Sequence, residues 1–406
     1  MAMDDLDLLI KACRLRGGGD QTVDIGIRGG RIAAIESEIL DGAATTIEAH
    51  GNLATESFIN PHLHLDKVFT LNMLDDEAMR DYHGRSMGKA MTAIEQASRV
   101  KESYEQGWIV ENVRTALRWA AKNGNTHIRA FADVDRKAKL EGVEALIQAR
   151  EEFKGEVELQ VVAFPQDGIV REPGAAELIR EAMELGADLV GGIPWIEYSD
   201  EDAKSHIDQM FVIALEFEAG ISMLVDDAGD PGLRTLETLA IKTLETGRQG
   251  KVLAHHARAM ELYPEPYFQK LAALLAEAEI AVVSDPHTGP LHARVVELRA
   301  ENIVVCLGQD DISDAYYPYG HNSMLEVAFL ASLLLWMTTR ADMEVLYDMV
   351  TVDAAAAMGI EQHALEVDSA ANLVVLQQPD VLGALRFHQP PMAVISGGKL
   401  LEELNQ

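Results

Sequence analysis

Two histidines separated by one residue, His62 and His64, lie in the apolar run SFINPHLHL that begins at Ser57. Side chains two residues apart leave the same face of a β-strand, so both imidazoles can reach one point. Imidazole pairs at this spacing can share a divalent cation, most often zinc, through nitrogens at about 2.0–2.1 Å. The alternative is a pair of core histidines satisfied by hydrogen bonds. The apolar neighbours and Pro61 favour the metal site.

The elements that would position this pair alternate along the central part of the chain. Short β-branched runs are separated by helix-length amphipathic stretches, such as NVRTALRWAAKNG and AAELIREAMELG, which end at glycine. After the run at Ser57, the others are THIRAFADV, LQVVAFP, LVGGIPWIE, ISMLVDD, KVLAHH, IAVVSDP and NIVVCLGQDD. Eight strand-then-helix units predict an α/β fold, the (β/α)8 TIM barrel. A doubly wound open sheet fits less well, because the sequence contains no glycine-rich phosphate loop.

Polar residues end nearly every predicted strand, where the active site of a TIM barrel lies. After His62 and His64 come Asp133, Gln166, Glu197, Asp226 with Asp227, His255 with His256, Asp285 with His287, and Asp310 with Asp311. Asp310 is the natural third, carboxylate ligand of a metal held by the two histidines. Paired aspartates also serve as helix N-caps or shape turns, and Asp226 and Asp227 precede Gly229 and Pro231. Gln166, after a proline, has an ordinary loop residue as its alternative role.

Strand-rich pieces at both ends of the chain predict a second, smaller domain. Alternating apolar runs with glycine turns fill the first 57 residues, and ANLVVLQQP and PMAVISGGKLL repeat the pattern near the C-terminus. We therefore expect a β-sandwich from 1–57 and 366–406, with the barrel at 58–365 inserted between its halves. The long segment 71–105 would form a lid over the barrel mouth or a subunit contact.

Composition excludes several classes of partner. The 406 residues carry a formal net charge of -32, which argues against nucleic acid and anionic membranes. Only two cysteines occur, far apart, and the acidic N-terminus lacks a secretory pattern, so we expect a cytoplasmic protein. The most apolar run, MLEVAFLASLLLWM from Met324, is too short to span a bilayer and predicts a buried helix. The expected partner is a small molecule.

Several segments together resemble the cytosine deaminase and N-isopropylammelide isopropylaminohydrolase branch of the amidohydrolase superfamily. They are FINPHLHLDK, VVAFPQDGI, DLVGGIP, GQDDISDAYYPYGHNSML and ANLVVL, spread over almost the whole chain. The resemblance implies one divalent metal ion per subunit, zinc or iron, which activates water to attack a ring carbon bearing an amino group. We also expect a homo-oligomer.

The resemblance assigns roles residue by residue. His62, His64 and Asp310 match metal ligands, and Gln166 matches an amide that reads the substrate ring. Asp311 matches a carboxylate that touches substrate or the hydrolytic water, and His256 matches a histidine that polarises the ring or its leaving group. Tyr316 stands where a tryptophan of the pocket wall occurs. His287 would overhang the barrel mouth and contact substrate.

Two histidines of the family pattern are absent. The metal histidine of strand five falls on Leu224, and a strand-two histidine falls on Phe131. Asp226, Asp227 or His255 would then supply a substitute ligand, or the metal is held weakly or not at all. A carboxylate substitute would favour a harder ion, manganese or iron, over zinc. For the group that shuttles protons, Asp227 is the first choice and Asp311 the alternate.

The sequence thus favours a hydrolase that acts on C–N bonds other than peptide bonds. The expected reaction is deamination, with ammonia or an amine released from a pyrimidine, s-triazine or similar N-heterocycle. One alternative is hydrolysis of a cyclic amide or imine at the same site. A metal-depleted, non-catalytic ligand-binding relative is the other, motivated by Leu224 and Phe131.

Overall fold

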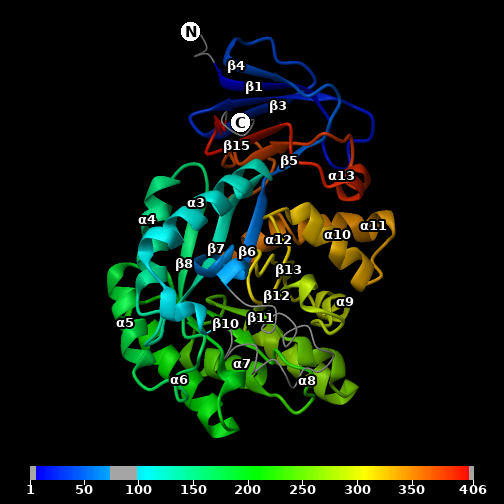
Figure 1. Cartoon of the computed structure of the whole chain (residues 1–406). Coiled ribbons are helices and arrows are strands. Elements are labelled where there is room, and N and C mark those ends of the chain that lie inside the picture. The colour runs from blue at the N-terminus through cyan, green and yellow to red at the C-terminus, as the bar shows by residue number, and fades with distance from the viewer. Residues whose placement is uncertain (1–5, 74–97, 402–406) are drawn as a thin grey trace.

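The computed structural model describes residues 6–73 and 98–401 and confirms the predicted fold class. Eight parallel strands form a nearly closed barrel in chain order, with helices outside it (Figure 1). The barrel strands are β6 Phe58–His64, β7 Asn125–Asp133, β8 Glu158–Phe164, β9 Leu189–Gly192, β10 Gly220–Val225, β11 Val252–His256, β12 Ala281–Ser284 and β13 Val305–Leu307. Most of the predicted lid segment, 74–97, lies outside the described residues.

Helices connect the barrel strands and cover them from outside. The α-helices are α3 Gln106–Lys122, α4 Glu141–Glu152, α5 Ala175–Leu185, α6 Asp200–Glu216, α7 Thr235–Thr246, α8 Glu265–Glu277, α9 Val295–Ala300, α10 Met324–Leu334, α11 Arg340–Asp348, α12 Val352–Met358 and α13 Val381–Phe387. Short 3-10 helices are η1 Leu65–Lys67, η2 Thr70–Met73, η4 Val100–Ser103, η5 Pro194–Ile196, η6 Arg258–Leu262 and η7 Pro286–Thr288. Their inward faces and the outward faces of the strands form the main apolar core.

Two four-stranded sheets from the chain ends pack together at one end of the molecule (Figure 1). The strands are β1 Leu6–Cys13, β2 Val23–Arg28, β3 Arg31–Glu36, β4 Ala43–Glu48, β5 Ala54–Glu56, β14 Leu373–Val375, β15 Ala393–Ser396 and β16 Lys399–Leu400. One sheet has the order β3-β2-β1-β4, and in the other β5 pairs with β14. Ile10, Ile25, Leu373 and Ile395 belong to their shared core. N- and C-terminal segments thus build the small sandwich, while its exact boundaries stay a prediction.

Two sequence expectations differ from the structure. The strand expected at 189–197 ends at Gly192, because Pro194 has no N–H for a strand ladder and begins the 3-10 helix η5. The apolar helix α10 is not wholly buried, since Leu333 is 56% exposed and Trp336, just after the helix, is 87% exposed. Neither difference moves the strands that carry the candidate site.

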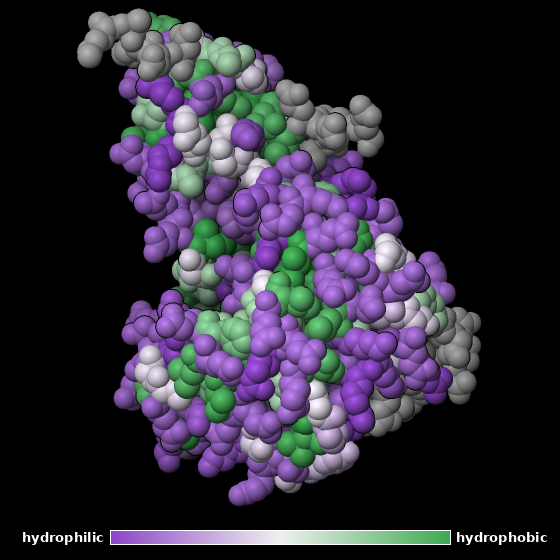
Figure 2. Space-filling model, turned by 90° about the vertical axis from the view of Figure 1, so that its left-hand side faces the viewer, coloured by the Kyte–Doolittle hydropathy of each residue, from purple (hydrophilic) through white to green (hydrophobic). Residues whose placement is uncertain are grey.

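The surface is largely hydrophilic on the face that Figure 2 shows. Hydrophobic residues are interspersed among the hydrophilic ones there. Within the two described ranges, no helix is both long enough and apolar enough to cross a membrane.

Candidate metal centre and pocket

Three side-chain atoms converge at the carboxyl end of the barrel strands. His62 Nε2 lies 3.3 Å from His64 Nε2 and 3.3 Å from Asp310 Oδ1, and the distance from His64 Nε2 to Asp310 Oδ1 is 3.5 Å. Ligands bound at about 2.0–2.1 Å in a tetrahedron lie about 3.3–3.4 Å from one another. The triangle therefore has the size of one face of a tetrahedral metal site, so these residues fit a divalent cation.

Closure of the barrel brings the three ligand atoms together. The peptide N–H of His64 donates to the carbonyl of Asp310 at 2.7 Å, and the N–H of Asp310 donates to His62 at 2.8 Å. This parallel bridge joins the first strand to the segment after the last. Gly308 permits the close approach, because a Cβ there would lie 2.7 Å from that of His62 and 2.3 Å from Asp285 Oδ1.

The other ring nitrogen of His62, Nδ1, contacts residues on the side away from the triangle. His62 Nδ1 lies 3.2 Å from Asp285 Oδ2 and 3.1 Å from His255 Nδ1, while His255 Nε2 pairs with the Ser222 hydroxyl at 2.6 Å. Partners of this kind fix the orientation of a metal-binding imidazole. His255, a sequence candidate for the fourth ligand, thus contacts the far side of His62 instead of the triangle. Asp285, for which the sequence suggested no role, orients the ring.

Burial keeps the histidines of the cluster unprotonated, which favours metal binding. Burial is the largest cause that lowers the pKa of His64 well below its usual value, and it lowers the pKa of His256 and His287 to about 4. Neutral imidazoles keep the lone pair that a metal requires. Burial, then the neighbouring Asp311, raises the pKa of Asp310 well above its ordinary value. Several carboxyl groups lie buried close together here, and a bound cation would stabilise their ionised forms.

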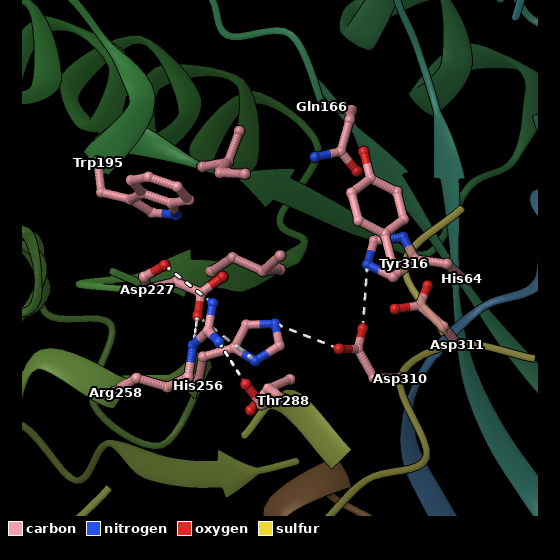
Figure 3. A pocket seen from close by; sticks show the side chains of 12 residues that line it. His64, Gln166, Trp195, Asp227, His256, Arg258, Thr288, Asp310, Asp311 and Tyr316 are labelled. Atoms are coloured by element: carbon pink, nitrogen blue, oxygen red, sulfur yellow. Dashed lines mark hydrogen bonds and ion pairs between the residues drawn. The ribbon is translucent and has the colours of Figure 1, made fainter. Parts of the chain in front are cut away.

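Two further imidazoles face the second oxygen of Asp310. His287 Nε2 lies 3.4 Å and His256 Nε2 3.8 Å from Asp310 Oδ2, and His287 Nε2 is also 3.6 Å from Asp311 Oδ2. Figure 3 shows His64 and His256 facing Asp310 from two sides. The predicted residues of strands one, six and eight therefore meet around a single carboxylate.

Adjacent aspartates after strand five have different surroundings. Asp226 accepts hydrogen bonds from the Thr235 N–H at 2.7 Å, the Thr235 hydroxyl at 2.6 Å and the Tyr263 hydroxyl at 2.6 Å. It anchors the start of α7, and the structure does not bring it to the triangle. Asp227 lines the pocket, but its carboxylate pairs with the Arg258 guanidinium. Leu224, the site of the absent family histidine, lines the same pocket.

A pocket opens beside the triangle, with about 480 Å³ of empty space when the solvent at its open mouth is included. Its described lining comprises His64, Gln166, Ile193, Trp195, Leu224, Asp227, His256, Arg258, Thr288, Asp310, Asp311 and Tyr316. Gln166 and Tyr316 are thus placed as the sequence suggested (Figure 3). His287 is not among these lining residues; its ring lies 4.3 Å from that of Tyr317.

Sequence reasoning missed three lining or supporting residues. Trp195 and Arg258 line the pocket, and Lys67 donates to the Gln166 amide at 3.1 Å. For Lys67, its position three residues after His64 was an available signal, since η1 turns directly out of β6. Neither Trp195 nor Arg258 carries such a signal, because both lie in 3-10 segments that the strand pattern does not predict.

Glu197 braces the wall of the pocket from outside it. Its carboxylate accepts hydrogen bonds from the N–H groups of Ile169 at 2.7 Å and Arg171 at 3.0 Å, and pairs with His206 Nδ1 at 2.7 Å. His206 Nε2 accepts from the N–H of Ile193, a lining residue, at 3.1 Å. This strand-end carboxylate therefore supports the pocket loops.

Removal of His206 tests that brace. We expect His206→Leu to lower the free energy of unfolding by about 3 kcal/mol, because it leaves a buried carboxylate and a buried N–H without their partner. Urea denaturation of the two proteins measures the change. The control His206→Gln, which retains polar atoms, should lose less. A loss below about 0.5 kcal/mol, the range of ordinary surface substitutions, would contradict the structural role.

Comparisons with known proteins agree with this geometry. Residues 45–401 match the model of the amidohydrolase family. N-isopropylammelide isopropyl amidohydrolase of Pseudomonas sp. (strain ADP) is 29% identical over 398 residues, 98% of this chain and 97% of that protein. Two crystal structures, each 28% identical and covering 97% of both chains, are similar. They are 5-methylcytosine deaminase from Klebsiella pneumoniae liganded with 5-fluorocytosine (TM-score 0.88) and N-isopropylammelide isopropylaminohydrolase from Burkholderia multivorans ATCC 17616 (TM-score 0.87).

The family match spans far more than half of the chain and includes every barrel strand. The two similar structures extend the likeness to the sandwich, since they cover nearly the whole chain. The buried histidine and aspartate cluster is consistent with the divalent metal site typical of such enzymes. This chain belongs to the amidohydrolase family of hydrolases.

Proposed function

We propose that the chain is a metal-dependent hydrolytic deaminase that releases ammonia or an alkylamine from a pyrimidine, s-triazine or similar N-heterocycle. The observation that carries the proposal is the triangle of His62 Nε2, His64 Nε2 and Asp310 Oδ1 beside an open pocket. The names of the relatives support the substrate class, since one acts on N-isopropylammelide and another binds 5-fluorocytosine.

His62, His64 and Asp310 would hold one divalent metal ion. When bound, such a cation lowers the pKa of a water molecule from about 15.7 toward 7, so that water can lose a proton near neutral pH. Two imidazoles and one carboxylate suit both zinc and ferrous iron, with manganese as a further option. Phe131 packs against both imidazoles, with its ring centroid 4.6 Å from that of His62 and 5.3 Å from that of His64.

The chain's own residues would move the protons. Asp311 lies in one cluster with His64 and Asp310 and lines the pocket, and it shares a hydrogen bond with the Asp314 carboxyl. It can accept the proton of the attacking water and deliver it to the departing amine. Asp227 is the other candidate, but its carboxylate is engaged in an ion pair with Arg258. His256, neutral and lining the pocket, would polarise the ring or its leaving group.

Leucine at position 224 fits this chemistry without a substitute ligand. Catalytic zinc sites commonly have three protein ligands and keep the fourth position for water or substrate. Leu224 lines the pocket beside the triangle and presents no donor atom there. We therefore propose that His62, His64 and Asp310 would be sufficient to hold the metal, which would then activate water without a ligand from position 224.

The variant Leu224→His tests whether the metal lacks a ligand from position 224. An added imidazole should raise the affinity for Zn²⁺ by about tenfold or more, and it should slow amine release because it competes with water for the metal. Titration against a chelator measures the affinity. Leu224→Met serves as the control and should leave it unchanged. Equal affinities of Leu224→His and wild type would contradict this proposal.

The reaction itself is tested on protein loaded with Zn²⁺, Fe²⁺ or Mn²⁺. Cytosine, 5-fluorocytosine and N-isopropylammelide are offered, and ammonia or isopropylamine is measured. We expect release of the amine with a carbonyl left on the intact ring. A ring-opened acid would instead indicate cyclic amide hydrolysis. No product from any compound, with metal bound, would count against deamination, and well under one metal per chain would favour a ligand-binding protein.

A further inference from the structure

We infer that Lys67 is a positioning residue that holds the Gln166 side-chain amide with its NH2 group directed into the pocket. The site would therefore select heterocycles that present a hydrogen-bond acceptor, a carbonyl oxygen or an unprotonated ring nitrogen, to Gln166. This inference rests on the proposed function. It adds that the substrate must present a hydrogen-bond acceptor, not a donor, to Gln166.

The contacts of Lys67 determine which end of the amide it meets. Lys67 lies on η1, is 6% exposed, and its ammonium donates to Asp133 Oδ1 at 2.8 Å and to Gln166 Oε1 at 3.1 Å. An ammonium has hydrogens only and cannot accept a hydrogen bond. The amide of Gln166 must therefore turn its oxygen toward Lys67, and its NH2 points away.

Lys67 remains charged in this buried place. Burial is the largest influence and acts to lower its pKa, but the carboxylates of Asp133 and Asp66 outweigh it and raise the pKa of Lys67 to about 12. The Tyr316 ring also faces the ammonium, with Nζ 5.7 Å from the ring centroid. The Lys67 ammonium, which donates to the Gln166 amide, is thus present over the whole pH range in which the enzyme would be assayed.

The NH2 group of Gln166 is left for a ligand. Figure 3 shows the amide nitrogen directed across the pocket toward the side of Trp195, and the oxygen toward Tyr316. Gln166 lines the pocket, and within residues 6–73 and 98–401 no hydrogen bond from its Nε2 is recorded. A ligand without an acceptor at this point would leave the NH2 group unpaired in a desolvated site, which weakens binding by about 5- to 150-fold.

The first test uses Gln166→Glu, which keeps an oxygen for Lys67 and replaces the NH2 group with a second oxygen. We expect the KM for cytosine to rise, and the affinity for 5-fluorocytosine to fall, by about 5- to 150-fold, with the metal content and the unfolding midpoint unchanged. An unchanged KM and affinity in a variant that still releases ammonia would overturn the inference while leaving the proposed function intact.

The second test asks whether Gln166 reads an acceptor. Binding of 4-amino-2-pyridone and of 4-aminopyrimidine, each of which lacks one acceptor of cytosine, is measured by calorimetry for wild type and Gln166→Glu. For the analogue without the contacted acceptor, the effect of the substitution should disappear. Equal losses for cytosine and both analogues would overturn the inference, because they would show a loss unrelated to an acceptor.

The role of Lys67 needs a variant that does not strand a buried carboxylate. Lys67→Met combined with Asp133→Asn removes the ammonium and neutralises its partner, so the amide is free to rotate. KM for cytosine should rise more than kcat falls, and the discrimination between cytosine and the two analogues should shrink. Lys67→Arg, which also only donates, should restore part of the discrimination. A loss of stability with unchanged KM and unchanged discrimination would show that Lys67 has only a structural role, and it would overturn the inference.

A neutron structure of the wild-type protein decides the orientation of the amide without any ligand. Deuterium density on the pocket side of Gln166, with its oxygen toward Lys67, is the expected result. Deuterium density on the Lys67 side would overturn the inference, whatever the enzyme turns over.

Discussion

Replacement of Asp310 by asparagine is expected to remove the metal and to slow amine release by more than about 10³-fold. Asp310 supplies the only anionic corner of the triangle, 3.3 Å from His62 Nε2 and 3.5 Å from His64 Nε2. An amide oxygen carries no net charge, so the cation loses its electrostatic partner, and water keeps its high pKa without the cation. Elemental analysis and an ammonia assay measure the two effects.

A matched control for this variant is Asp226→Asn. Asp226 is also a buried aspartate at a strand end, but its oxygens accept hydrogen bonds from Thr235 and Leu236 at the start of α7 and from the Tyr263 hydroxyl. This control should lower the unfolding midpoint and keep the metal. If Asp310→Asn retains one metal per chain with wild-type affinity, the triangle is not the metal site. Loss of the metal from a folded Asp226→Asn variant would also contradict the assignment of the metal site to the triangle.

Asp311→Asn is expected to lower kcat by about 10²- to 10⁴-fold while the metal stays bound, the size of a lost general acid–base group. Asp311 lies beside Asp310 in the pocket and shares a hydrogen bond with the Asp314 carboxyl. An amide in its place can neither take the proton of the water nor return it to the amine. Steady-state kinetics of metal-loaded protein measures the change.

Asp227→Asn separates the two candidates for the proton shuttle. Asp227 is paired with Arg258, and His256 Nδ1 lies 3.8 Å from its carboxylate. We expect this variant to lose less in kcat than Asp311→Asn and more in thermal stability, since the buried Arg258 guanidinium loses its ion pair with the Asp227 carboxylate. A larger kcat loss in Asp227→Asn would instead identify Asp227 as the shuttle, which is the first choice from the sequence alone.

Much of the fold could be predicted because its signals are local. The period of two that places His62 and His64 on one face, and the apolar runs that end in polar residues, each lie within a few residues of sequence. Glycines mark turns in the same local way, as in the hairpin of β2 and β3, where Gly29 and Gly30 have φ of 58° and 77°. These local patterns were sufficient for the barrel and the small sandwich.

The division of labour between adjacent residues could not be predicted. Neighbours on a strand point to opposite faces, and the sequence does not say which face receives which residue. Asp226 anchors α7 while Asp227 lines the pocket, and His255 supports His62 while His256 lines the pocket. All four residues lie at the ends of predicted strands, so the sequence pattern alone predicts for each of them the same place at the barrel mouth.

Contacts between segments far apart in the chain also could not be predicted from the sequence. The bridge that joins Asp310 to β6 links residues nearly 250 positions apart, and Lys67 meets Gln166 across 99 positions. Glu197 has the same strand-end position as the site residues, yet the early end of β9 at Gly192 turns it toward His206. Which polar residue enters the pocket is decided by these long-range contacts.

The most direct test of the metal centre is a crystal structure of the metal-loaded protein with anomalous data collected at the absorption edge of the bound metal. The account predicts one strong peak within about 2.0–2.2 Å of His62 Nε2, His64 Nε2 and an oxygen of Asp310, with no protein donor from position 224. A peak bound by other residues, or no peak in protein that still releases amine, would contradict it.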